Sequence, residues 1–484
     1  MSLDRVDARF LLPTLPSRAT VVGQFPTWAE GLEQAGIELS GVDSTEAPQL
    51  AIARADAIDA AIATGADLLL VEGGTATGAL RRAGFHVQRF LPRPTVERPA
   101  VFIPLDQPHA ARYAATHWTA STPWWRRARN SLAAHALGLG LAPSRGAVTL
   151  VATRRREPPA FVAAAASRGH EASSWLLTPG RGDELSRSVF HLFGQGSHSP
   201  DLVLKFARVT NYRAPFDRDE AGLALVRTAG SPVEGHAPRL LDRFDVEGLE
   251  ASVETAARGE RLTRLLARSG RAPGLELIER IAAWLISVAE ATAAGPETLE
   301  AERLRLVQEV LPLWEGHGVD AALVNDLPAL GAVLQHNDPG PWNIVADSSA
   351  FTLVDWESAR QHGLPLWDLV YFLTEALATL DQVADQDRDE YVGRLFRGEA
   401  KSSGVLFAWI RRAVSASAIP PVAVGPLVTL CWLHHGISHR TRHRTVEALG
   451  AGSANFVPPI ERTADVWLRD PGLGASWTKW RADS

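Results

Sequence analysis

The chain has 484 residues, which is enough for two or three folded units. Its hydrophobic fraction of 46% and charged fraction of 21% are typical of a globular protein, and its formal net charge of -6 gives no indication of nucleic-acid binding. The single cysteine, Cys431, excludes an internal disulfide and is typical of a reducing compartment.

The sequence gives no indication of export or membrane insertion. The N-terminal stretch "MSLDRVDARFLLPTLPSR" carries acidic residues early and only a short apolar run, unlike a secretory signal. The most apolar later stretch, "AIPPVAVGPLVTLCWL", is interrupted by prolines and is shorter than the roughly 20 residues that a membrane-spanning helix needs. We therefore expect a cytoplasmic protein.

The first third of the chain alternates between two patterns. Apolar runs at 19–23, 37–43 and 66–74 predict strands, and the Ala-rich runs 27–36 and 48–65 between them predict helices. Further strands are predicted at 99–105 and 146–155, with a helix at 124–140 and a linker at 153–159. This alternation is typical of an α/β domain with a parallel sheet, which we assign to residues 1–157.

The pattern then changes. Residues 173–208 predict three strands joined by glycine-bearing turns, 216–230 an amphipathic helix, and 238–256 two more strands. From about Arg261 onward the spacing of apolar residues is mostly helical. We expect a small β-rich lobe at 158–258 and a helical lobe at 259–484, and two such lobes commonly hold a ligand between them.

Chemistry-bearing side chains gather in "LQHNDPGPWNIV" and in "FTLVDWE" after it. Two prolines require Asp338 and Asn343 to lie in an irregular loop, and Asp355 ends an apolar strand. Such oxygen ligands suit Mg²⁺, and a carboxylate left off the metal can orient or deprotonate a hydroxyl. The alternative is that these Asx side chains only bond their own backbone in a turn.

The two motifs resemble the catalytic core of the aminoglycoside phosphotransferase and choline kinase family, which has the protein-kinase fold. The resemblance implies that Asp338 is the catalytic base, that Asn343 and Asp355 hold Mg²⁺, and that His336 braces the catalytic loop. Trp342 and Trp356 adjoin these ligands and are candidates to shape the substrate mouth, although core packing is the default role for tryptophan.

An earlier strand and helix fit the same family. "DLVLKFAR" puts Lys205 in mid-strand, where the resemblance implies a contact with the α and β phosphates of ATP, and "RDEAGLALVR" puts its ion-pair partner Glu220 on the next helix. A strand lysine can also serve to block edge pairing. In a chain with only three lysines, arginine would more readily fill that role.

Three further segments match the family. Backbone groups from Glu254 to Ala256 resemble the hinge that meets adenine, and Asp368 resembles the aspartate that supports the catalytic loop. "TPGRGDE" offers Gly180 and Gly182 as a nucleotide loop without the full G-x-G-x-x-G pattern. The likeness covers roughly residues 170 to 440.

The first domain resembles a degenerate class I SAM-dependent methyltransferase in its order of strands and helices, with Asp43 ending the second strand. The glycine-rich cofactor turn is replaced by "VVGQFP", in which only Gly23 remains and Phe25 and Pro26 are bulky. We therefore expect a scaffold or a carbohydrate-related binding module instead of an active methyltransferase.

The sequence predicts an ATP- and Mg²⁺-dependent phosphotransferase that phosphorylates a hydroxyl of a small metabolite, such as a sugar, amino sugar or aminoalcohol. The alternative is a regulatory or scaffold module with a kinase-like fold that binds nucleotide or glycan with little turnover. The acceptor and the oligomeric state stay open.

Overall fold

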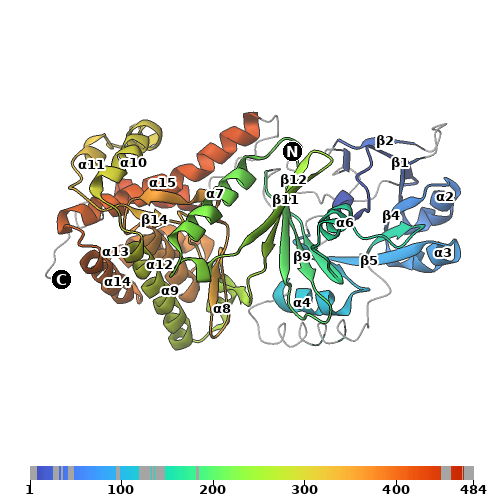
Figure 1. Ribbon diagram of the computed structural model, residues 1–484, viewed down its shortest axis with the longest axis horizontal. Coiled ribbons are helices and arrows are strands. Elements are labelled where there is room, and N and C mark those ends of the chain that lie inside the picture. Colours follow the sequence, from blue (N-terminus) through green and yellow to red (C-terminus); the bar gives the residue numbers. More distant parts are fainter. Residues whose placement is uncertain are drawn as a thin grey trace. The chain divides into compact units, whose positions relative to one another are not determined.

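The computed structural model describes most of the chain (Figure 1). The described residues are 8–24, 32–33, 36–41, 48–93, 99–118, 132, 136, 148–180, 185–314, 316–448, 459–470 and 473. They belong to two compact units, the first comprising Met1–Arg213 and Arg239–Ala256 and the second Ala214–Pro238 and Ala257–Ser484.

One mixed sheet of twelve strands runs through the described part of the first unit. Its order is β11-β12-β10-β9-β8-β6-β5-β7-β4-β3-β1-β2. The bounds are β1 Arg18–Val22, β2 Glu38–Ser40, β3 Leu50–Arg54, β4 Leu68–Glu72, β5 His86–Arg93, β6 Val101–Pro104, β7 Thr149–Thr153, β8 Ser174–Thr178, β9 Ser188–Phe193, β10 Leu202–Phe206, β11 Leu240–Val246 and β12 Leu249–Thr255.

The N-terminal sheet is parallel only in part. Strands β2, β1, β3 and β4 pair in parallel as predicted, but β7, β5 and β6 pair antiparallel. The predicted helix 48–65 is wrong in its first half, because Leu50–Arg54 is strand β3 and only Ile58–Ala63 forms helix α2. Residues 50–53 are all buried between β1 and β4, and this two-sided burial overrides their helix-like composition.

Alternate residues of the sheet enter two separate cores. In β3, Leu50 and Ile52 join one core with helix α6 (Ala160–Ser167). Ala51 and Ala53 join the other core with α2, α3 (Thr77–Arg82) and α4 (Pro108–Trp118). This alternation follows from the two-residue period of a strand. The remaining helices of this unit are η1 Ala8–Leu11, η2 Ala55–Ala57, η3 Gly74–Ala76, α3 Thr77–Arg82, α4 Pro108–Trp118 and α6 Ala160–Ser167.

The methyltransferase resemblance stays a prediction. Gly23 has a φ of +78°, and a Cβ there would lie 2.8 Å from Cβ of Ala57, so the turn after β1 is tightly packed. Phe25, Pro26 and Asp43 lie outside the described residues, as does most of the predicted helices 27–36 and 124–140.

The five predicted strands of the small lobe are confirmed as β8 to β12, all antiparallel to their neighbours within that set. They continue the N-terminal sheet through a pairing of Phe102 in β6 with Leu177 in β8. Because one sheet can extend through two domains, the boundary placed after residue 157 stays a prediction.

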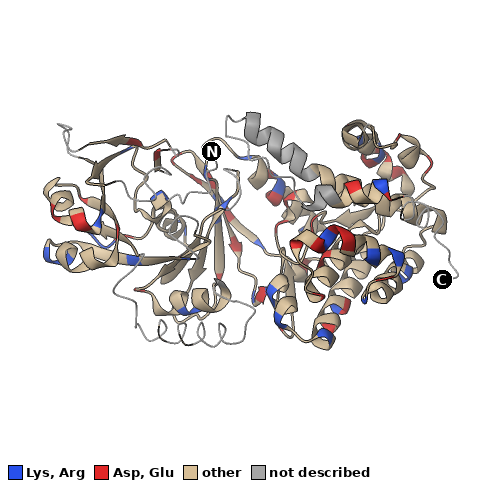
Figure 2. Cartoon of the chain, turned by 180° about the vertical axis from the view of Figure 1, so that it is seen from behind, with Lys and Arg blue, Asp and Glu red and all other residues tan. Residues whose placement is uncertain are grey.

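The second unit is mostly helical, as predicted. Acidic and basic residues are interspersed along its helices (Figure 2). Its elements are α7 Ala214–Ala229, η4 Glu234–His236, β13 Glu260–Arg261, α8 Leu262–Arg268, α9 Arg271–Ala291, η5 Pro296–Leu299, α10 Glu300–Arg305, the π-helix η6 Leu306–Val310, η7 Leu311–Trp314, α11 Ala322–Asn325, β14 Val333–Gln335, β15 Ile344–Ala346, β16 Phe351–Leu353, η8 Trp356–Ser358, β17 Arg360–Gly363, α12 Trp367–Leu380, η9 Asp385–Asp387, α13 Arg388–Arg397, α14 Ser403–Ala416, α15 Pro421–Ala448 and α16 Pro459–Arg469.

This unit also has two short sheets, β13-β15-β16 and β14-β17. Their strands β14 and β15 flank the loop at residues 336–343. Among the described helices, none is by itself long and apolar enough to cross a membrane. Only α14 with the first part of α15 reaches that length and composition, as a pair bent by 118°.

Helix α7 packs closely on the segment that follows Asp355. A Cβ added to Gly222 would lie 2.1 Å from the carbonyl oxygen of Trp356, so only glycine allows this approach. The buried carboxylate of Asp219, three residues earlier, accepts a hydrogen bond of 3.1 Å from the amide of Trp356. The helix is thereby fixed to the backbone beside Asp355.

Replacing Gly222 with alanine should therefore destabilise the second unit. The overlap forces α7 away from Trp356, and overpacking of this kind costs about 1–3 kcal/mol. Gly404→Ala in helix α14 is the matched control, because its Cβ would meet nothing within 4 Å. We expect thermal denaturation to show a lower Tm for Gly222→Ala and an equal or higher Tm for the control; equal Tm values for both variants would contradict the close packing.

Candidate active site

The loop at residues 336–343 joins β14 to β15, and β16 leads into Asp355. The amide of Val354 donates a hydrogen bond of 2.8 Å to the carbonyl of Asn343. Since Val354 precedes Asp355, this bond holds the end of the loop beside the strand-end carboxylate. The hairpin thus brings together the two segments that the sequence motifs marked.

Asp338 and Asn343 contact each other directly. The Asn343 carboxamide nitrogen donates to the Asp338 carboxylate at 2.9 Å and to the Asp338 backbone carbonyl at 3.0 Å. A turn in which each Asx side chain bonds only its own neighbouring backbone would not give this pair. The carboxamide nitrogen is committed to Asp338, so the carbonyl oxygen is the Asn343 atom suited to a cation.

His336 is buried and bonded at both ring nitrogens. Its Nε2 lies 3.1 Å from the carbonyl of Val354 and therefore donates, while Nδ1 accepts from the Asp338 amide at 3.2 Å. These partners require the neutral tautomer with a proton on Nε2. Burial lowers the pKa of His336 to about 4, which matches that neutral form. His336 therefore connects the loop to the strand that ends in Asp355.

Asp368, in the first turn of α12, holds the loop from the other side. Its carboxylate accepts hydrogen bonds from the amides of His336 at 2.6 Å and Asn337 at 3.0 Å. Asn337 has a left-handed φ of 65°, which turns the chain just before Asp338. Burial raises the pKa of Asp368 to about 6, while the two amide bonds oppose the rise.

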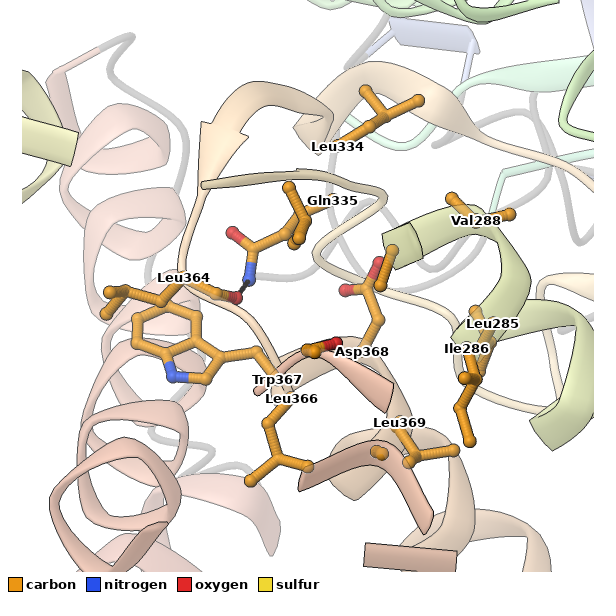
Figure 3. Close-up of a pocket in the computed structure, with 14 residues that line it drawn as sticks. Leu285, Ile286, Val288, Leu334, Gln335, Leu364, Leu366, Trp367, Asp368 and Leu369 are labelled. Carbon is orange, nitrogen blue, oxygen red and sulfur yellow. Dashed lines mark hydrogen bonds between the residues drawn. The ribbon is translucent and has the colours of Figure 1, made fainter. Parts of the chain in front are cut away.

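A small cavity of about 30 Å³ lies beneath this bracing. Figure 3 shows Asp368 on its helix and Gln335 with its amide donating to the carbonyl of Leu364, at 2.5 Å. A Cβ on Gly363 would lie 1.7 Å from the Gln335 carboxamide oxygen, so this position requires glycine. The volume is about that of a single water molecule. Because Gln335 and Asp368 line the cavity, it is part of the packing that supports the loop and not a substrate site.

Asp355 has a left-handed backbone, with φ 71° and ψ 62°. Left-handed conformation costs roughly 1–2 kcal/mol for a residue with a side chain, and Asp tolerates it better than most. Burial is the first cause that raises the pKa of Asp338 to about 8, and the charge of Asp355 is the second. The two carboxylates are therefore close enough to repel each other.

Trp342 and Trp356 have different roles. Trp356 is buried and donates from its indole to the Leu353 carbonyl at 2.8 Å, so it packs in the core and not at a substrate mouth. Trp342 is partly exposed, and a hydrogen bond from its side chain lowers the pKa of Asp338. Its indole lies over Gly340, where a Cβ would come within 2.3 Å of the ring.

Lys205 and Glu254, both in the first unit, form an ion pair. The ammonium of Lys205 lies 2.7 Å from the Glu254 carboxylate, and both residues are nearly inaccessible to solvent. The sequence motif had assigned Glu254 only a backbone role. Glu220 is on α7 in the second unit, and its pairing with Lys205 stays a prediction.

The hinge and glycine-loop predictions also stay untested. The amides of Thr255 and Ala256 donate to the carbonyls of Arg239 and Asp201 at 3.0 and 2.9 Å. Gly180 is tightly packed, since a Cβ would lie 2.4 Å from the Ser186 carbonyl oxygen. Gly182 lies outside the described residues.

Residues 177–411 match the sequence model of the phosphotransferase enzyme family. The chain contains a phosphotransferase-family segment. This match confirms the resemblance on which the assignments of Asp338, Asn343 and Asp355 rest, and the segment includes every one of those residues. No curated protein matches the chain.

Several solved structures are similar to the phosphotransferase segment or to more of the chain. Aminoglycoside phosphotransferase APH(3'')-Id from Streptomyces rimosus is 16% identical, covering 53% of this chain and 96% of its own, with a TM-score of 0.29. An aminoglycoside-3'-phosphotransferase of type VIII is 20% identical, covering 52% and 97%, with a TM-score of 0.31. The bifunctional kinase-methyltransferase WbdD is 14% identical over 84% of each chain, with a TM-score of 0.27.

Two substitutions should move the pKa of Asp338 in opposite directions. Asp355→Asn removes a repelling charge and should lower that pKa from about 8, while Trp342→Phe removes a hydrogen bond to the carboxylate and should raise it. Both pKa shifts can be measured by carbon-13 NMR titration of labelled aspartate carboxyls in protein free of divalent cations. The Asp338→Asn variant assigns the Asp338 signal.

Asp347→Asn is the control, because Asp347 is bonded to its own loop at Ser349 and Ala350. It should leave the titration of Asp338 unchanged. An Asp338 signal that titrates near pH 4 in the unsubstituted protein would contradict the buried, doubly acidic environment.

Proposed function

We propose that the chain is an ATP- and Mg²⁺-dependent phosphotransferase that phosphorylates a hydroxyl of a small metabolite. The observation that carries the proposal is the Asp338 carboxylate, bonded to Asn343 and held on a loop whose amides are fixed by Asp368. This arrangement lies within the segment that matches the phosphotransferase family.

The residues at the loop fit a hard divalent cation. Asn343 offers a carbonyl oxygen and Asp355 a carboxylate, and Mg²⁺ prefers such oxygen ligands. The mutual repulsion of Asp338 and Asp355 is a second sign, because bound positive charge would relieve it. When bound, Mg²⁺ would neutralise charge on the phosphate oxygens of the nucleotide.

Asp338 would accept the proton of the attacking hydroxyl. It is the carboxylate of the 336–343 loop, and the Asn343 bond fixes its orientation. A base must be deprotonated to act, and its raised pKa means that the charge of Asp355 has to be compensated for Asp338 to ionise fully at neutral pH. His336 would act as a positioning residue, since both of its nitrogens are engaged with the backbone.

Lys205 would bind the phosphates of ATP. Its pairing with Glu254 holds the ammonium in place within the β10 to β12 strands. We infer a sugar, amino sugar or aminoalcohol as acceptor, since each carries a hydroxyl. Direct transfer of phosphate to a hydroxyl needs only the base, the metal ligands and the phosphate-binding lysine named above.

The test is ATP consumption by the full chain against a panel of sugars, amino sugars, aminoalcohols and nucleosides. We expect turnover on at least one acceptor, dependent on added Mg²⁺, and a loss of about 10²–10⁴ in kcat for Asp338→Asn, as is typical when a general base is removed. Asp347→Asn, in an exposed turn, is the matched control and should retain full turnover.

Two results would count against this function. Turnover that survives Asp338→Asn would contradict the role of the base. Nucleotide binding without turnover on any acceptor would instead favour a regulatory module that binds nucleotide or glycan.

A further inference from the structure

A second concave site lies in the first unit, beside helix α4. Figure 1 labels this helix. It is a groove of about 450 Å³, and its walls come from one face of α4 and from the turn between β9 and β10. The residues that line it are His109, Arg112, Tyr113, Thr116, His117 and His198.

Helix α4 has two chemically distinct faces. Its alanines at 110, 111, 114 and 115 are buried in the core against the sheet. The groove residues follow the helical spacing of three and four on the other face, where His109, Arg112 and Thr116 are exposed. A face built only to be solvated would more usually mix acidic and basic residues, but helix α4 contains no acidic residue.

The groove residues are arranged in pairs. The Nδ1 atoms of His109 and His198 lie 3.1 Å apart, and this contact joins the helix to the β9–β10 turn. The rings of Tyr113 and His117 stack with centroids 4.0 Å apart, and the edge of Tyr113 packs on Phe193. These contacts give the groove one polar wall and one aromatic wall.

The chemistry of the lining favours an anion. Arg112 carries a fixed positive charge and a fork of N–H donors that matches a phosphate, and an imidazole Nε2 of the His109–His198 pair adds a further donor. The Thr116 hydroxyl donates to the Arg112 carbonyl at 2.9 Å, so it can only accept from a ligand. No carboxylate is among the six lining residues. A transition metal on His109 and His198 would lie near the charge of Arg112, and no metal-binding group of three His, Cys, Asp or Glu occurs among the described residues.

The dimensions favour a small molecule. Sites for small ligands have volumes of roughly 300–1,000 Å³. The groove is within this range, and the stacked Tyr113 and His117 form a wall suited to the ring of a sugar or similar group beside the anion.

The groove is separate from the residues assigned to ATP. Five of its six residues precede the phosphotransferase segment, and only His198 lies inside it. Lys205 pairs with Val189 near the start of β9, whereas His198 follows the other end of that strand, beyond the pairing of Leu202 with Leu192. The groove and Lys205 therefore lie at opposite ends of the same two strands.

We propose that the groove formed by helix α4 and the β9–β10 turn binds a small phosphorylated metabolite, with Arg112, His109 and His198 holding its phosphate. The groove shares no residue with those assigned to phosphate transfer.

The test uses inorganic phosphate as the minimal probe. The full chain is labelled with carbon-13 at histidine Cε1 and titrated at constant pH and ionic strength, with sodium chloride as the ionic control. His109→Gln and His198→Gln assign the two signals. We expect saturable shifts of both signals with phosphate, and about a tenfold weaker affinity in Arg112→Gln, because one charge-assisted hydrogen bond is lost.

Arg81→Gln is the matched control, since Arg81 is an exposed helical arginine of the same unit outside the groove. It should bind phosphate as the unsubstituted protein does. Absence of saturable shifts at His109 and His198 overturns the proposal. So does an affinity unaffected by Arg112→Gln, or saturable Zn²⁺ binding at the two histidines without any phosphate effect, which would make the groove a metal site.

Discussion

The arrangement of the candidate active site depends on one carboxylate, that of Asp368. It accepts the amides of His336 and Asn337, which are consecutive residues in a turn with a left-handed φ. These buried amides have no strand partner at that point, and an unbonded buried amide costs about 1–3 kcal/mol. Asp368 therefore stabilises a backbone shape that neither strand nor helix supports. That shape directs Asp338 toward Asn343, and His336 then connects the loop to the strand that ends in Asp355.

The second constraint is the contact of helix α7 with the segment after Asp355. Gly222 allows the helix to touch the Trp356 carbonyl, and Asp219 accepts the Trp356 amide. Both backbone groups of Trp356 are thus in contact with the helix that also carries Glu220. A displacement of α7 would move the backbone next to Asp355. The helix position and the orientation of the strand-end carboxylate are therefore mechanically linked.

The sequence predicted the elements that carry the site better than the contacts within it. The pair Asp338 and Asn343 was predicted because two prolines enforce a loop and the residue types suit a cation. The strand content of 173–256 followed from turns and alternation. The strand Leu50–Arg54 was missed, since an Ala-rich run gives a helix-like pattern and only its neighbours on both sides make it a strand. The left-handed φ of Asp355 leaves no signal in composition or spacing.

Strand register explains the remaining difference, the pairing of Lys205 with Glu254. Lys205 is opposite Ser252, so Glu254 lies two residues further along β12 on the same face of the sheet. Long side chains reach such diagonal neighbours, but the register that aligns them is not readable from a single sequence. The ion pair connects the residue assigned to phosphate with the segment assigned to adenine. Under the proposed function, a nucleotide that drew the ammonium toward its phosphates would compete with the buried carboxylate of Glu254, and phosphate binding would then be coupled to the position of strand β12.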